Sequence, residues 1–257
     1  MMRDKIIRFL NNQLKVSEIA DKSINGLQVD GNKFVNRVVT CVDADISSIK
    51  NAIELKADLM IVHHGLFWRN DETIVGPLYE KLSLLIKNNL SLYAVHLPLD
   101  IHEEFGNNIL IARQLKLRNI SKFAEYNGLF LGYFGESNIS DINSFMSFVE
   151  SSLNTKAKLF NFNKSSNVRL VGIVSGSGGF AIKDMHNYGI DTLVVGEANY
   201  ADILLAKDLG INLIQAGHYE TEVFGVRAIA NKLNELFSSD GLECIFYDNK
   251  ENRNFHL

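Results

Sequence analysis

Short apolar runs alternate with amphipathic stretches along the first hundred residues. The runs at 36–44, 57–64 and 90–96 have the length and the β-branched content of buried strands. The stretches between them, at about 45–56 and 77–88, place apolar residues at helical spacing. This order predicts an α/β domain with a largely parallel sheet.

The second half of the chain repeats the same order. Apolar runs at 169–175, 190–198 and 211–218 are again separated by helical patterns. A shift of 133 residues places Asp58 on Asp191 and His64 on Glu197. A duplicated α/β unit explains this order, although the general patterning of α/β proteins would produce the same few identities.

The remaining segments complete a two-domain prediction. The segment 125–168 contains a hairpin-like stretch, a helix and a strand, and the chain ends in a helix and a strand that are expected to return to the first half. We therefore expect two related α/β domains with mostly parallel or mixed sheets. The first comprises 1–124 with 224–257, and the second comprises 125–223.

Composition narrows the class of protein. The 257 residues carry a net charge of −4, which gives no electrostatic footprint for nucleic acid. Cys41 and Cys244 form no disulfide framework or zinc motif. The first twenty residues predict an amphipathic helix, not a signal peptide or membrane span. A cytoplasmic protein without a membrane partner is expected.

Two adjacent histidines, His63 and His64, end one of the predicted strands and precede Gly65. Neighbouring strand residues point to opposite faces, so the two rings converge only if the strand ends and bends there. Gly65 permits such a bend. The alternative is one histidine in the core and one at the surface.

Two further loops supply similar groups. His96 ends a strand, and Asp100 follows the proline-stiffened turn after it. His218 ends the last run of the second half, and Glu222 lies four residues on, which places both on one side of a helical turn. As an isolated pair, the latter would equally suit an exposed surface.

Together the three loops predict a metal site. Imidazoles and carboxylates suit divalent Zn, Fe, Mn, Co or Ni. Five or six ligands exceed the needs of one tetrahedral ion, so two divalent metal ions per chain are expected. Such a pair generates and holds a hydroxide nucleophile near neutral pH.

Five motifs in order resemble one family. They are NGLQVDG (25–31), VHHGLFW (62–68), HLPLDIHEEFGNN (96–108), VVGEANYAD (194–202) and AGHYETE (216–222). Together they resemble the GTP cyclohydrolase I type 2-like family, the Nif-three-like proteins with a dinuclear metal centre. The resemblance extends from about residue 5 to 250 of this chain.

The resemblance implies two metal ions in the cleft between the domains and a toroidal homohexamer. It implies five metal ligands: His63, His64, Asp100, His218 and Glu222. Glu222 would bridge both ions, His64 and Asp100 would hold one, and His63 and His218 the other. Tyr219 stands where some family members have a second histidine.

Two more residues are candidates for catalysis. His96 would orient a ligand or water, or move protons, and Glu197 is either a general base or a structural carboxylate at a strand end. The glycine loop at 175–180 is either a phosphate cradle or a tight turn. Phe67 and Trp68 either line a base-stacking pocket or pack in the core or between subunits.

The leading hypothesis is a metal-dependent hydrolase acting on a nucleotide or related heterocycle. For GTP, attack at C8 of the guanine would open the imidazole ring and release formate. The alternative is a ring-shaped scaffold or regulatory protein with structural metals that binds a protein or nucleic-acid partner, although the acidic charge argues against DNA. Metal storage is a third hypothesis.

Overall fold

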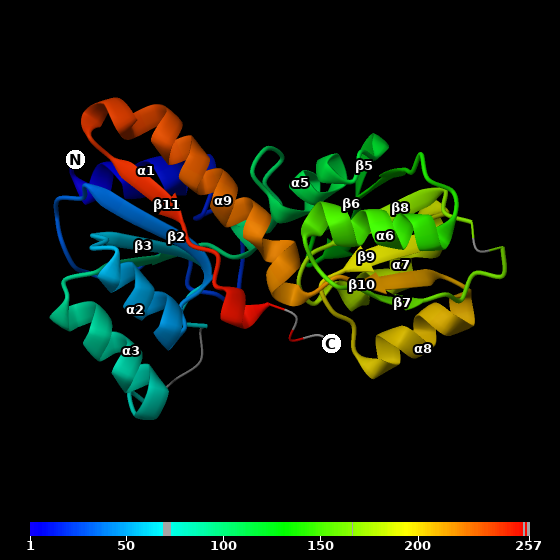
Figure 1. Ribbon diagram of the computed structural model, residues 1–257, viewed down its shortest axis with the longest axis horizontal. Helices are drawn as coiled ribbons and strands as arrows, with labels where there is room; N and C mark the ends of the chain where they lie inside the picture. The colour runs from blue at the N-terminus through cyan, green and yellow to red at the C-terminus, as the bar shows by residue number, and fades with distance from the viewer. Residues whose placement is uncertain (69–72, 166, 254, 256–257) are drawn as a thin grey trace. The chain divides into compact units, whose positions relative to one another are not determined.

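The chain forms two compact units in a computed structural model that describes residues 1–68, 73–165, 167–253 and 255 (Figure 1). The first unit comprises Met1–Leu99 and Gly225–Asn249, and the second comprises Asp100–Phe224 and Lys250–Leu257. Each unit has its own sheet and its own apolar core. None of the helices within the described residues combines the length and apolar character that a membrane span requires.

The first unit contains a five-stranded sheet in the order β1-β4-β3-β2-β11. The four strands from β4 to β11 are parallel, whereas β1 pairs antiparallel with β4. The strand bounds are β1 Gly26–Val29, β2 Arg37–Asp43, β3 Leu59–His64, β4 Ser91–Ala94 and β11 Glu243–Phe246. The helices are α1 Arg3–Gln13, α2 Ile46–Glu54, α3 Gly76–Lys87, α4 Leu97–Asp100, which ends in the second unit, and the C-terminal part of α9 His218–Phe237.

Helices cover both faces of the first sheet, which explains why successive residues of β3 and β4 are buried without alternation. Ile49 of α2 and Leu85 of α3 pack in one cluster with Met60 of β3. Figure 1 shows α1 and α9 on the opposite face. The α2 helix begins at a side-chain cap, because Asp45 accepts a hydrogen bond from the Ser48 N–H at 2.6 Å.

The second unit contains a six-stranded mixed sheet in the order β5-β6-β8-β9-β10-β7. Only β8, β9 and β10 are parallel neighbours, and the other pairs are antiparallel. The strand bounds are β5 Arg118–Tyr126, β6 Leu129–Glu136, β7 Lys158–Phe160, β8 Leu170–Val174, β9 Thr192–Val195 and β10 Asn212–Gln215. The helices are α5 Asn107–Gln114, α6 Ile142–Leu153, α7 Ile182–Tyr188, α8 Tyr200–Leu209 and the first turns of α9.

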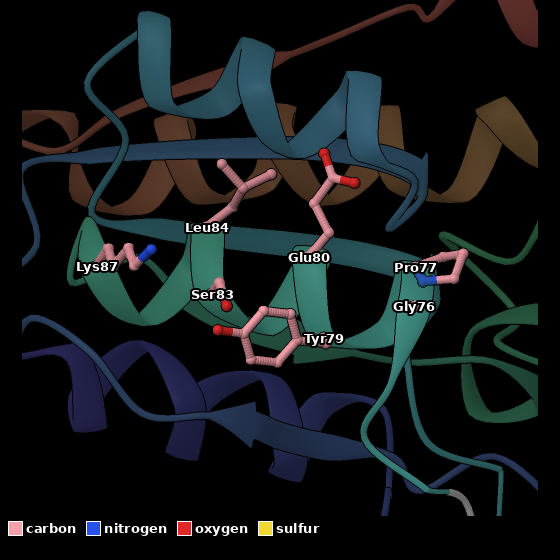
Figure 2. Close-up of a pocket in the computed structure, with 7 residues that line it drawn as sticks. All are labelled: Gly76, Pro77, Tyr79, Glu80, Ser83, Leu84 and Lys87. Atoms are coloured by element: carbon pink, nitrogen blue, oxygen red, sulfur yellow. The ribbon is translucent and has the colours of Figure 1, made fainter.

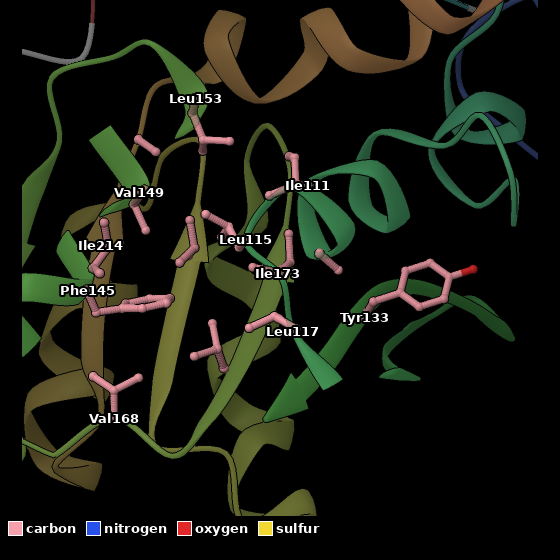
Figure 3. Close-up of a cluster of buried hydrophobic side chains, with 14 of the residues drawn as sticks. Ile111, Leu115, Leu117, Tyr133, Phe145, Val149, Leu153, Val168, Ile173 and Ile214 are labelled. Atoms are coloured by element: carbon pink, nitrogen blue, oxygen red, sulfur yellow. The ribbon is translucent and has the colours of Figure 1, made fainter. Parts of the chain in front are cut away.

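Two apolar clusters fill the space between this second sheet and its helices. Phe145 of α6 and Ile111 of α5 pack against Ile173 on one face (Figure 3). Ile182 and Met185 of α7 pack with other sheet residues on the opposite face. Both faces of the sheet are therefore covered. A site on this unit can form at the loops that follow the strand ends.

The expected fold class, two α/β units with mixed sheets, is confirmed. The predicted run at 211–218 was wrong at its end, because β10 stops at Gln215 and His218 is the first residue of α9. Residues 100–124, which the sequence analysis grouped with the first half, lie in the second unit because β5 pairs with β6. The hairpin connecting these two strands turns at 127–128.

Replacing Phe145 by alanine tests the second core. Phe145 is 0% exposed, so the loss of its ring would leave a cavity among apolar neighbours. We expect Phe145→Ala to lower the free energy of unfolding by about 3–5 kcal/mol, measured by urea denaturation. Phe130→Ala is the matched control because Phe130 is 41% exposed on β6, and its effect is expected to stay within about 0.5 kcal/mol.

Candidate metal centre

Three histidines converge at the carboxyl ends of β3 and β4. In the parallel register Val62 lies beside Ala94, so the chain positions two residues on, His64 and His96, follow the same alignment. The possible ligand atoms of His63, His64 and His96 all lie within 4.8 Å of one another. The ring centroids of His63 and His64 are 4.8 Å apart, so the two neighbours converge as the sequence analysis required.

Each of these rings has an oxygen acceptor at Nδ1. His63 Nδ1 lies 2.9 Å from the carbonyl oxygen of Val95, and His64 Nδ1 lies 2.8 Å from Asp43 Oδ1. His96 Nδ1 lies 3.1 Å from the Asp21 carboxylate. Because these oxygens only accept, Nδ1 must carry the proton, and Nε2 is the nitrogen with a lone pair for a metal. Asp21 and Asp43 were not singled out from the sequence.

The Asp21 carboxylate is buried within the first unit and does not lie at the surface. Its side chain is 2% exposed and accepts hydrogen bonds from the Ser23 N–H, the Asn25 amide and the Leu97 N–H at 3.0–3.1 Å. Burial alone would raise the pKa of Asp21, but the hydrogen bond and charge of His96 with these donors hold it well below its usual range. The carboxylate therefore stays ionised beside the ring.

Gly65 is needed for space. A Cβ at this position would lie 2.4 Å from Gln28 Oε1 and 2.5 Å from Ala94 Cβ. The backbone of Gly65 is not in the left-handed region, so the expected bend does not require glycine for its dihedral angles. Close approach of β1 and β4 excludes any side chain after His64.

In the second unit, His218 and Glu222 occupy the first turn of α9. His218 Nε2 lies 3.2 Å from Glu222 Oε2, the contact that i, i+4 spacing predicts. Glu197, in the loop after β9, has Oε1 3.1 Å from His218 Nδ1 and accepts the Ser177 hydroxyl at 2.6 Å. Glu197 is thus placed to orient this imidazole.

The charges around His218 favour its protonated form. Glu222 first, and then Glu197, raise the pKa of His218 to about 10 against the opposing effect of burial. The Ser177 hydroxyl, together with His218, lowers the pKa of Glu197. A metal ion bound at His218 would have to displace this proton, so affinity would rise with pH.

Asp100, the last residue of α4, is 6% exposed and is held by two donors. Asn107 Nδ2 donates to Asp100 Oδ1 at 2.9 Å, and the Ser175 hydroxyl donates to the same oxygen at 3.3 Å. Asn107 does not cap α5, whose N-cap is Gly106, and its side-chain amide orients Asp100 instead.

The glycine loop after β8 uses its N–H groups internally. Ser175 N donates to Asn108 Oδ1 at 2.6 Å, Gly176 N to Thr221 Oγ1 at 3.0 Å, and Gly178 N to the Gly176 carbonyl at 2.9 Å. These donors are therefore not arranged around a phosphate. The tight-turn interpretation is the one that the contacts favour.

Gly176 keeps a space open in front of His218 and Glu222. Its φ is +58°, and a Cβ there would lie 2.3 Å from Glu222 Oε1 and 3.2 Å from His218 Nε2. Glu222 Oε1 therefore packs directly against the Gly176 backbone, where a side chain would displace it. The imidazole and carboxylate donors held in this way fit a divalent ion of the zinc, iron or manganese type.

The two aromatic residues after Gly65 have different surroundings. Phe67 packs with the apolar core of the first unit. The Trp68 ring lies 5.0 Å from that of His96, and its N–H donates to the Gly65 carbonyl at 3.1 Å. Trp68 is therefore the aromatic residue that borders the histidines.

A surface hollow along α3 is separate from these groups (Figure 2). Its lining consists of Gly76, Pro77, Tyr79, Glu80, Ser83, Leu84 and Lys87. It contains none of the histidines or carboxylates described above.

Known proteins resemble this chain over almost its whole length. Proteins named GTP cyclohydrolase 1 type 2 homolog are 39% identical in Deinococcus radiodurans, covering 91% of this chain and 89% of the relative, and 39% identical in Pyrococcus horikoshii, covering 97% and 98%. Among solved structures, protein ybgI, of unknown function, has a TM-score of 0.91 and 31% identity and covers 98% of this chain and 100% of its own. TTHA1606 from Thermus thermophilus has a TM-score of 0.85 and 34% identity over 97% and 98%.

The family comparison agrees with these relatives. The model of the Duf34/NIF3 family (NGG1p interacting factor 3) matches residues 1–253. This chain therefore belongs to the Duf34/NIF3 family.

Proposed function

We propose that this chain is a dinuclear divalent-metal protein and a metal-dependent hydrolase acting on a nucleotide or related heterocycle. The proposed ligands are His63, His64, Asp100, His218 and Glu222, as the sequence resemblance implies. The observation that carries the proposal is that each unit separately gathers imidazole or carboxylate donors at the ends of its parallel strands. Relatives named GTP cyclohydrolase 1 type 2 homolog support the choice of substrate class.

The support for ligand roles lies in how the donors are held. Oxygen acceptors at Nδ1 of His63 and His64 support Nε2 as the metal-binding nitrogen of these two rings, and the Glu197 carboxylate orients the His218 ring. Two donors on Asp100 Oδ1 orient that carboxylate. Such supporting contacts commonly change metal affinity by about 10–100-fold when removed.

When bound, the ions would supply a hydroxide nucleophile and stabilise developing negative charge. The chain itself would supply a proton acceptor, Glu197, and an aromatic side chain, Trp68, beside the histidines. Glu197, whose side chain is 50% exposed, stays ionised through its contact with Ser177 and is the proposed proton acceptor. For GTP, the expected net reaction is hydrolytic opening of the imidazole ring with release of formate.

The first test measures metal content and GTP turnover together. We expect about two divalent ions per chain and metal-dependent formate release from GTP. Glu222→Gln keeps the side-chain shape but removes the charge, so it should lower turnover at least about 100-fold and metal content to one ion or fewer. Formate release and elemental analysis check both.

Glu235→Gln is the matched control, because Glu235 is exposed on the same helix. Native values are expected for it. Full metal occupancy with no turnover of GTP or of other phosphorylated heterocycles would reject the hydrolase proposal and favour the scaffold alternative.

The second test uses the space at Gly176. Gly176→Ala would place a methyl group against Glu222 Oε1, so we expect metal affinity to fall at least about 100-fold. Gly189→Ala is the control for backbone strain, since its φ is +66° and its nearest non-local atom would lie 3.9 Å from the new Cβ. Both should lose about 1 kcal/mol of stability in urea denaturation, and only Gly176→Ala should lose metal in a chelator competition. Equal metal binding by both variants would refute a metal position beside Gly176.

We also propose the homohexamer that the family resemblance implies. Exposed apolar side chains on α8 support an interface between copies: Tyr200, Leu204 and Leu209 are 76%, 41% and 44% exposed. Sedimentation equilibrium should give six times the chain mass of 28.9 kDa. Tyr200→Lys combined with Leu204→Lys should shift the protein to smaller species, whereas a native protein that sediments as a monomer would refute the assembly.

A further inference from the structure

We propose that His96 binds a metal ion directly through Nε2 and that Asp21 positions it for this role. The inference rests on the proposed function and deepens it, because it adds a sixth ligand to the five assigned above. It gives the first unit a three-imidazole array formed by His63, His64 and His96. Neither proton transfer nor the orientation of another ligand is then the primary role of His96.

The arrangement of the three nitrogens carries the first step. The ligand atoms of His63, His64 and His96 lie within 4.8 Å in every pair. The His96 ring centroid is 5.0 Å from that of His63 and 5.8 Å from that of His64. His96 therefore belongs to the same cluster as the two assigned ligands.

The backbone explains why His96 keeps this place. The His96 N–H donates to Asn25 Oδ1 at 2.7 Å, which fixes the chain where it leaves β4. Val62 with Ala94 is the last register pair of β3 and β4, and His64 and His96 each lie two residues beyond it. The side chain is 21% exposed, so it is accessible to an ion while its base is anchored.

Asp21 supplies the second step. Its two oxygens lie 3.1 Å from His96 Nδ1 and also accept the N–H groups of Ser23 and Leu97. A 2% exposed carboxylate with this many donors cannot swing with the ring. The ring is therefore fixed with its proton on Nδ1, the tautomer that a metal-binding Nε2 requires.

The donor chemistry gives the third step. Imidazole nitrogen is a regular ligand of zinc and of the other divalent ions proposed here. The His64 and His96 rings each have a carboxylate at Nδ1, Asp43 and Asp21, and the His63 ring has a carbonyl. All three imidazoles thus have an oxygen acceptor at Nδ1. His96 is therefore held in the same way as the two assigned ligands, His63 and His64.

Cobalt substitution of the full-length protein tests the proposal. The visible absorption of Co²⁺ reports the number and type of its ligands, and chelator competition reports affinity. We expect His96→Ala to change the absorption spectrum and to weaken Co²⁺ binding at least about 10-fold. Asp21→Asn should weaken binding about 10–100-fold while keeping the native spectral shape, since the ring remains present.

Control variants and the native protein distinguish the possible outcomes. His186→Ala, which removes an exposed histidine on α7, should bind Co²⁺ like the native chain. If His96→Ala unfolds in a thermal melt, His96→Asn replaces it. A folded His96 variant with native affinity and spectrum would overturn direct ligation by His96 and leave the proposed function intact. A native protein that binds no Co²⁺ or Zn²⁺ would instead overturn the metal proposal itself.

Discussion

The parallel pairing of β2, β3 and β4 is the constraint on which the first donor cluster depends. Asp43 pairs with His64, and the alignment of Val62 with Ala94 carries His96 to the same edge. A slip of one residue between these strands would turn one side chain of each pair to the other face. The burial of these strands fixes the register, so the packing of the core also determines the positions of the donors.

The histidines of both units are oriented by the same kind of contact. An oxygen acceptor occupies Nδ1 in His63, His64, His96 and His218, although the acceptors come from different elements. Asp21 comes from the segment before β1, and Glu197 from the loop after β9. The rings are thus ordered before any ion arrives, which lowers the entropy that binding must overcome.

The sequence predicted the elements that carry the donors but not the contacts that orient them. Strand runs and the family motifs located His63, His64 and His218, because apolar periodicity and ligand spacing are local properties. Asp21 was not predicted from the sequence, because it lies in an irregular segment and contacts His96 only in the folded chain. Similarly, the role of Asn107 depends on Asp100 and Ser175 being brought together by tertiary packing, which no spacing rule encodes.

Gly176 has a consequence for how sequence change is tolerated. Its left-handed backbone alone would accept asparagine, which adopts that region at low cost. The atoms facing it would not accept any side chain, because the first carbon already collides with Glu222. The constraint at this position is therefore steric exclusion of a side chain and not the turn conformation. Drift from glycine to asparagine, neutral at many helix ends and turns, would here leave a folded chain with an altered site.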